Sequence, residues 1–101
     1  MVAFRSCNFA QSFTITVKKL ILNKCQFNND CIMNLNVTEL TFFDCRNTNL
    51  EWLGPFLQEN NGKLKCLKLI NVVVPAEVKT FLNSDHKIDV ICNNVTFQAA
   101  V

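Results

Sequence analysis

The fold of this chain is decided by the stretch VTELTFFDC, residues 37–45, because the same spacing of apolar residues recurs before and after it. The frame has apolar residues at its first, fourth and sixth positions and a cysteine at its ninth. Further copies begin at Val17, Leu64 and, less regularly, Asp85, and a partial copy opens the chain at Val2. Equivalent positions of successive copies lie about 18 to 27 residues apart, with Val2 equivalent to Leu20. Such a period is typical of stacked repeats rather than of a globule with one closed core.

Each frame predicts a short β-strand, because apolar residues alternate within it and β-branched and aromatic types favour a pleated surface. The predicted strands lie near residues 2–6, 18–24, 38–44, 65–71 and 86–92. Segments of a dozen or more residues link them, which suits crossovers and therefore a parallel sheet. We expect an α/β fold with a single domain over residues 1–101. It would be a short solenoid with about five parallel strands on its concave face and short helices or loops on its convex face.

The last copy of the frame is the least regular. It begins with Asp85 where an apolar residue is expected, and its inward pair is predicted to be Ile88 and Val90. The ninth position, occupied by cysteine in two earlier copies, would then fall on Asn93. This choice of frame sets the expected register of the last strand against its neighbour, so it decides which side chains lie directly opposite one another.

Two of the links predict helices. Apolar residues recur there at helical spacing, and a proline stands near the start of each predicted helix, at Pro55 and at Pro75. The apolar stripes are Leu50, Leu53, Phe56 and Leu57 in the third link and Val78, Phe81 and Leu82 in the fourth. Trp52, the only tryptophan, is expected to pack in the core on the helix side.

Composition excludes several classes of function. Half of the 101 residues are apolar, which is enough for a continuous core, and the net charge is only +2. Basic residues are scattered among acidic ones, so we expect no nucleic-acid partner. The longest apolar run is far shorter than the roughly twenty residues of a membrane span, and the first residues lack the pattern of a secretory signal. We expect no membrane association and no cofactor.

The six cysteines fall into two groups. Cys7, Cys25 and Cys45 occupy the same position in successive copies, so we interpret them as a ladder of small buried thiols. A metal site is not expected, because the chain has no Cys-x-x-Cys pair and only one histidine. A redox or disulfide role remains open for the cysteines outside the ladder, which are Cys31, Cys66 and Cys92.

The repeats resemble a known motif. The pattern Leu-x-Leu-x-x-Cys at residues 20–25 and Leu-x-Phe-x-x-Cys at residues 40–45 resembles the leucine-rich repeat, in the variant with cysteine where others place asparagine. The resemblance runs from Val2 to about Asn93 and is closest to the ribonuclease-inhibitor-like and cysteine-containing classes. It implies a repeat protein that acts as a scaffold or adaptor through protein binding. No F-box motif is visible, so membership of a ubiquitin ligase would need residues that are absent here.

In such a repeat the residues that alternate with the inward pair point to the concave face. Phe43, Ile70 and Ile91 are expected to form an apolar column there, and a contiguous exposed apolar patch usually marks a partner site. Charges are expected to pair between strands, for example Lys68 with Asp89. Another element of the chain or a second copy could also cover the patch. The predicted protein-binding residues are Phe43, Ile70, Ile91, Ile21, Lys68, Asp44 and Lys24.

These observations predict an intracellular, cytoplasmic module without catalytic activity that binds a protein partner or a neighbouring subunit. An enzyme would need a base, and the sole histidine, His86, lies in a polar turn where we expect it to be solvated. The alternative is a secreted or cell-surface recognition domain, because Asn36 and Asn94 each begin a glycosylation sequon. The apolar ends further suggest a piece of a longer protein, or an end covered by another subunit.

Overall fold

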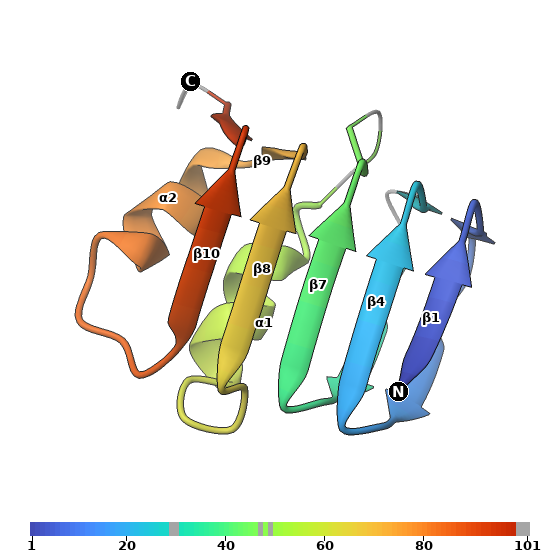
Figure 1. Ribbon diagram of the computed structural model, residues 1–101, viewed down its shortest axis with the longest axis horizontal. Coiled ribbons are helices and arrows are strands. Elements are labelled where there is room, and N and C mark those ends of the chain that lie inside the picture. The colour runs from blue at the N-terminus through green and yellow to red at the C-terminus, as the bar shows by residue number, and fades with distance from the viewer. Residues whose placement is uncertain (29–30, 47, 49, 99–101) are drawn as a thin grey trace.

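The computed structural model describes residues 1–28, 31–46, 48 and 50–98. Five parallel strands lie side by side in one sheet, in the same order as in the sequence, and the fold is α/β as expected (Figure 1). The strands of this sheet are β1 (Val2–Arg5), β4 (Lys19–Asn23), β7 (Glu39–Phe43), β8 (Cys66–Ile70) and β10 (Asp89–Asn93).

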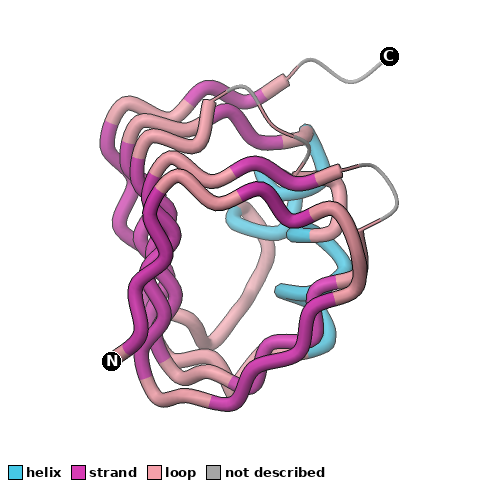
Figure 2. The backbone as a smooth tube through the Cα atoms, turned by 90° about the vertical axis from the view of Figure 1, so that its right-hand side faces the viewer, coloured by secondary structure: helices cyan, strands magenta, loops and turns pink. Residues whose placement is uncertain are grey.

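After each of the first four strands the chain returns behind the sheet before the next strand begins (Figure 2). Short strands on these returns pair in parallel with their equivalents one return later. The pairs are β2 (Asn8–Phe9) with β5 (Gln26–Phe27), β3 (Phe13–Thr16) with β6 (Met33–Asn36), and β9 (Val73–Val74) with β11 (Thr96–Phe97). Parallel pairing of this kind therefore joins the first return to the second, and the fourth return to the segment that follows β10.

Both expected helices are present and lie behind the sheet (Figure 1). Helix α1 (Leu53–Glu59) starts two residues before Pro55, which is tolerated because the first turn of a helix needs no hydrogen bond from that nitrogen. Helix α2 (Ala76–Leu82) begins directly after Pro75, whose φ of −64° leads into helical geometry. The chain leaves α1 through Gly62 at a φ of 99°, a conformation that favours glycine.

The core lies between the sheet and the returning segments. Two rows of inward side chains cross the sheet, and their members on β4, β7 and β8 are fully buried, with exposed fractions of 0%. The register shows the first row to be Val2, Leu20, Leu40, Leu67 and Val90, and the second to be Phe4, Leu22, Phe42, Leu69 and Cys92. The end strands cover their inward residues less well, since each has a neighbour on one side only.

The predicted ladder of buried thiols is confirmed for two of its three members, because Cys7 is only half-buried. Cys25 and Cys45 are each 1% exposed. The Cys25 thiol donates to the Phe4 carbonyl at 3.4 Å, and the Cys45 thiol donates to the Leu22 carbonyl at 3.3 Å. Each thiol therefore bonds to the backbone of the preceding strand, which ties successive turns of the chain together.

Trp52 packs in the helix-side core, as predicted. Its ring lies 5.4 Å from Phe27, 5.8 Å from Phe42 and 5.8 Å from Phe56, measured between ring centroids. These contacts join a return segment, the sheet and α1. Edge and tilted arrangements of aromatic rings of this kind add to the free energy gained from burial alone.

The predicted frame of the last strand was wrong by two residues. Val90, not Ile88, is the register partner of Leu67, so β10 runs over Asp89–Asn93 instead of 86–92. Val95 takes the ladder position that we assigned to Asn93, because β11 pairs with β9 directly after it. The error arose because Cys92 occupies an inward position where the frame calls for an aliphatic residue.

Candidate functional site

The front of the five-stranded sheet is the candidate site, and we call it the open face. Among the described residues no helix, strand or loop lies in front of it (Figures 1 and 2). Its side chains alternate with the buried rows, so they lie on the side away from the core. On the four strands from β4 to β10 they are Lys19, Ile21, Asn23, Glu39, Thr41, Phe43, Cys66, Lys68, Ile70, Asp89, Ile91 and Asn93.

Four apolar residues of the open face form one patch. Phe43 is 39% exposed and Ile91 is 50% exposed. Ile70 is the register partner of Phe43 on the next strand, and Ile21 lies diagonally from Phe43 on the previous one. Diagonal neighbours in a sheet lie about 7–8 Å apart, within reach of an aromatic ring. The structure thus brings together Ile21, Phe43 and Ile70, with Ile91 diagonal to Ile70.

Ile91 and Lys68 occupy different places from those predicted. Ile91 is the register partner of Lys68, while Ile70 is paired with Asn93. Asp89 is the partner of Cys66, so the predicted pairing of Lys68 with Asp89 across the strands was wrong. Lys68 therefore has Thr41 and Ile91 as its register partners, so no acidic residue lies directly opposite it on either neighbouring strand.

The other two predicted residues, Lys24 and Asp44, lie just past their strands in left-handed turns, at φ values of 54° and 56°. Asn71 has the same conformation in the next repeat, with a φ of 58°. Its side-chain amide donates to Asp44 Oδ1, and the amide of Asn94 donates in turn to Asn71 Oδ1. Asp44 is therefore already engaged in supporting the turns, so Lys24 and Asp44 form a rim of the open face rather than its centre.

Asn23 was not among the predicted protein-binding residues, although the repeat frame places it in the same concave-face column as Phe43. It is the register partner of both Arg5 and Phe43. Its Oδ1 atom is buried and has no hydrogen-bond partner in the described part of the chain. The signal was available, because Asn23 occupies the position of Phe43 in the preceding repeat.

The thiols do not form disulfides. All six cysteines are free, and Cys66 and Cys92 lie on opposite faces of adjacent strands. Burial raises the pKa of the Cys25, Cys31 and Cys45 thiols, which lowers the fraction of reactive thiolate at neutral pH. In the described residues no group of three or more His, Cys, Asp and Glu side chains is placed to hold a metal ion.

His86 is more enclosed than predicted. Its ring stacks on Phe81 with centroids 5.2 Å apart, and its Nδ1 accepts a hydrogen bond of 3.3 Å from the backbone N–H of Ile88. His86 does lie in the loop between α2 and β10, as predicted, but its side chain is half-buried instead of fully solvated. The ring instead helps to fasten the segment between α2 and β10.

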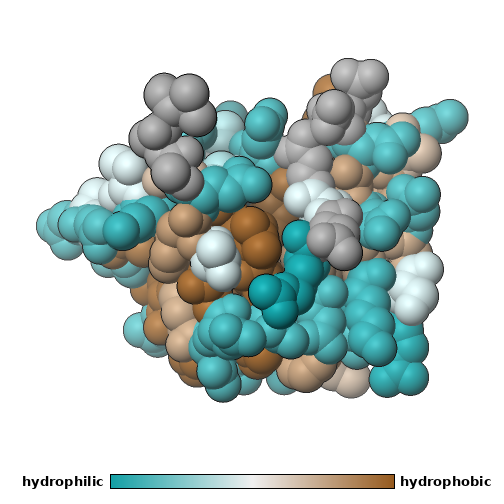
Figure 3. Space-filling view, turned by 90° about the horizontal axis from the view of Figure 1, so that it is seen from above, coloured by the Kyte–Doolittle hydropathy of each residue, from teal (hydrophilic) through white to brown (hydrophobic). Residues whose placement is uncertain are grey.

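The side of the molecule above the sheet, toward which the strands run, is largely hydrophilic with hydrophobic atoms exposed near its middle (Figure 3). Within residues 1–28, 31–46, 48 and 50–98 there is no helix long and apolar enough to cross a bilayer. No protein-family model, curated protein or solved structure matches this chain.

Proposed function

We propose that this chain is a non-catalytic protein-binding module of the leucine-rich-repeat type, a short solenoid that binds a protein partner through the open face. The carrying observation is that Phe43, Ile70 and Ile91, on three adjacent strands, present apolar side chains on a face that no described element covers. An apolar patch surrounded by polar residues is typical of a protein-protein interface.

The internal repetition supports the repeat assignment. Strand order follows chain order, the return strands pair in parallel, and the ladder thiols bond to the preceding strand. The charged and polar residues around the patch, among them Arg5, Lys19, Glu39 and Asp89, suit a hydrated rim. Rim charges chiefly affect the association rate and the choice of partner, whereas the apolar centre contributes most of the affinity.

The test is affinity capture from a cell extract with quantitative mass spectrometry, using the unmodified protein, Phe43→Asp and a matched control. Ile32→Asp is the control, because Ile32 is 59% exposed but lies outside the open face, next to β6. Loss of an aromatic anchor costs at least about 2 kcal/mol, so Phe43→Asp should lower the recovery of a direct partner by roughly thirtyfold. Equal recovery of every captured protein by the two variants would contradict the proposal.

We place this module in the cytoplasm, because all six cysteines are unpaired and a reducing compartment keeps thiols in that state. A secreted recognition domain is the second candidate. It is favoured by the exposure of Asn36 and Asn94, the two sequon asparagines. Thiol counting under denaturing conditions separates the two: six free thiols support the cytoplasmic module, and a disulfide or a glycan on Asn36 supports the secreted one.

A further inference from the structure

A second recognition site is suggested by the free edge of β6, on the return side of the molecule. Among the described residues, β3 and β6 form a sheet of two strands, so each has one edge without a strand neighbour there. The next return after β6 forms α1. Within the part of the chain that the structure describes, the edge of β6 that faces away from β3 is therefore not continued by backbone hydrogen bonds.

The register identifies the backbone groups on this edge. The carbonyls of Ile32 and Asn36 accept hydrogen bonds from Phe13 and Val17 at 2.9 and 3.0 Å, so they point toward β3. Backbone groups of a strand alternate in direction, so the N–H and C=O groups of Met33 and Leu35 point to the other side. In the described part of the chain these groups have no hydrogen-bond partner. These groups recur at every second residue, the same spacing at which an extended peptide presents its own backbone groups on one side.

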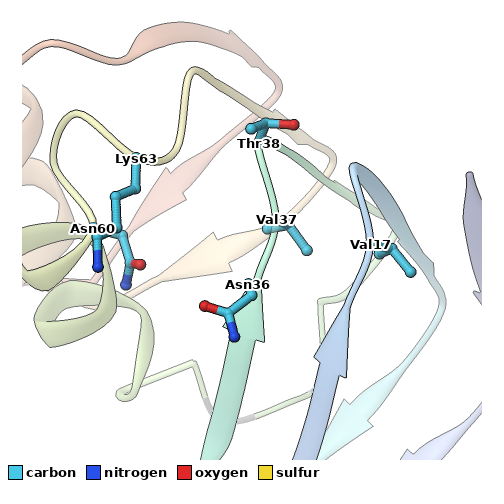
Figure 4. Close-up of a pocket in the computed structure, with 6 residues that line it drawn as sticks. All are labelled: Val17, Asn36, Val37, Thr38, Asn60 and Lys63. Carbon is cyan, nitrogen blue, oxygen red and sulfur yellow. The ribbon is translucent and has the colours of Figure 1, made fainter.

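A groove lies between this edge of β6 and helix α1. One hollow of about 220 Å³ lies between β6 and the residues Phe56, Glu59 and Asn60. A second hollow of about 210 Å³ continues past Asn36 and is bordered by Lys63 (Figure 4). Asn36 and Asn60 line both hollows, so the two join end to end. At about 3.3 Å per residue, the stretch from 33 to 38 can accompany four or five residues of extended chain.

The opposite wall of the groove is polar and charged. The amide nitrogen of Asn60 donates to the Phe56 carbonyl at 2.9 Å, which leaves its Oδ1 as an acceptor. Lys63 and Glu59 are exposed, each on the wall of a different hollow. Neither has an ion pair within the described residues. The groove therefore carries positive charge at the Thr38 end and negative charge beside β6.

We propose that the groove between β6 and α1 binds an extended peptide segment, which pairs through its backbone with Met33 and Leu35 and places an acidic side chain against Lys63. Addition of a strand to a free sheet edge is a recurrent mode of peptide recognition, in which main-chain hydrogen bonds supply affinity and side-chain contacts supply specificity. This site is separate from the open face, so it does not depend on the function proposed above.

The test begins with a phage-displayed library of random twelve-residue peptides selected on the intact protein. Selected peptides are expected to favour β-formers with one Asp or Glu. A synthetic copy of the best peptide is then measured by fluorescence anisotropy, with N-methyl groups placed on its backbone one position at a time. Methylation should weaken binding about tenfold or more at alternate positions and leave the positions between them unaffected, because only every second N–H can pair with the edge.

Two matched variants test whether the peptide binds in the groove. Asn34 and Thr14 are register partners on β6 and β3, and both are exposed. Asn34→Trp should obstruct the groove and abolish binding, whereas Thr14→Trp should leave the affinity within about twofold. Lys63→Glu should lower the affinity for the acidic peptide about tenfold and leave the affinity for its Asp→Asn or Glu→Gln version unchanged.

Hydrogen exchange supplies a measurement that does not depend on any variant. Bound peptide should slow exchange of the Met33 and Leu35 amides about tenfold or more, with no change at Ile91 on the open face. The proposal is overturned if no peptide is enriched over a blank surface, if Asn34→Trp binds as well as Thr14→Trp, or if protection appears on the open face instead.

Discussion

Substitution of Leu40 by alanine measures whether the inward rows form one continuous core. Leu40 is 0% exposed, and its register partners Leu20 and Leu67 are 0% exposed as well. The substitution removes three carbon atoms, whose transfer from water contributes about 2.4 kcal/mol at roughly 0.8 kcal/mol each. The strands around the cavity left by this substitution are hydrogen-bonded on both sides, so they cannot move in to fill it. The cavity therefore raises the expected loss of unfolding free energy to about 3–4 kcal/mol.

The matched control is Val90→Ala, at the end of the same row on β10. Val90 is half-buried because no strand covers its outer side, so this substitution should cost about 1 kcal/mol or less. Urea unfolding followed by circular dichroism reports both. With a slope of roughly 1.5 kcal/mol per molar urea, Leu40→Ala should lower the midpoint by about 2 M. The slope itself should not change.

Equal midpoints for Leu40→Ala and Val90→Ala would refute the reasoning, because the centre and the end of the row would then be equally well packed. A changed slope for Leu40→Ala would also count against it. The slope follows the surface exposed on unfolding, and a changed value would mean that the two strands beside β7 separate instead of tolerating a cavity.

Three further predictions concern packing and titration. Thr48→Val should lower the free energy of unfolding by about 1–2 kcal/mol in urea titration, because the buried backbone N–H of Phe27 would lose the hydroxyl to which it donates; an unchanged value would show that water replaces it. Gly54→Ala should lower the melting temperature despite the better helix propensity of alanine, because the new Cβ would lie 3.1 Å from the Cβ of Glu77 on α2, which cannot rotate away; a rise would mean that the two helices can separate at no cost. Stability should fall above about pH 9, since the pKa of the Cys25 and Cys45 thiols is near its ordinary value of 9.0 in the unfolded chain but is raised by burial when the chain is folded; Cys45→Ala should weaken this dependence.

Most of the sheet could be predicted because the apolar residues of each frame indicate both a strand and the face that it buries. Leu20, Leu40 and Leu67 were predicted to share one inward row, and they do, since strand alternation and a common frame leave no other arrangement. Val90 was assigned to the second inward row instead of the first, because Ile88 and Val90 are both aliphatic and Cys92 was not expected at an inward position. The stretch from Asn94 to Phe97 resembles the stretch from Asn71 to Val74, but only the pairing of β11 with β9 shows that this likeness sets the register.

The candidate site was predicted less well than the sheet. Phe43 and Ile70 are neighbours on the open face as predicted, because their register follows from two regular frames. The two-residue error in β10 moved Ile91 next to Lys68 and removed the predicted pairing of Lys68 with Asp89 across the strands. The groove beside β6 could not be predicted at all, since it depends on how α1 packs against the return strands.

The amino-acid sequence by itself determined the repeated strands, their parallel order and the inward residues of the first four strands of the sheet. These features depend on residues close together in the chain, where periodicity and the length of each link leave few alternatives. Only the tertiary structure decided the register of the last strand, the enclosure of His86 and the free edge of β6. Each of these depends on which neighbour packs against a segment, and packing across many residues of separation leaves no local pattern in the sequence.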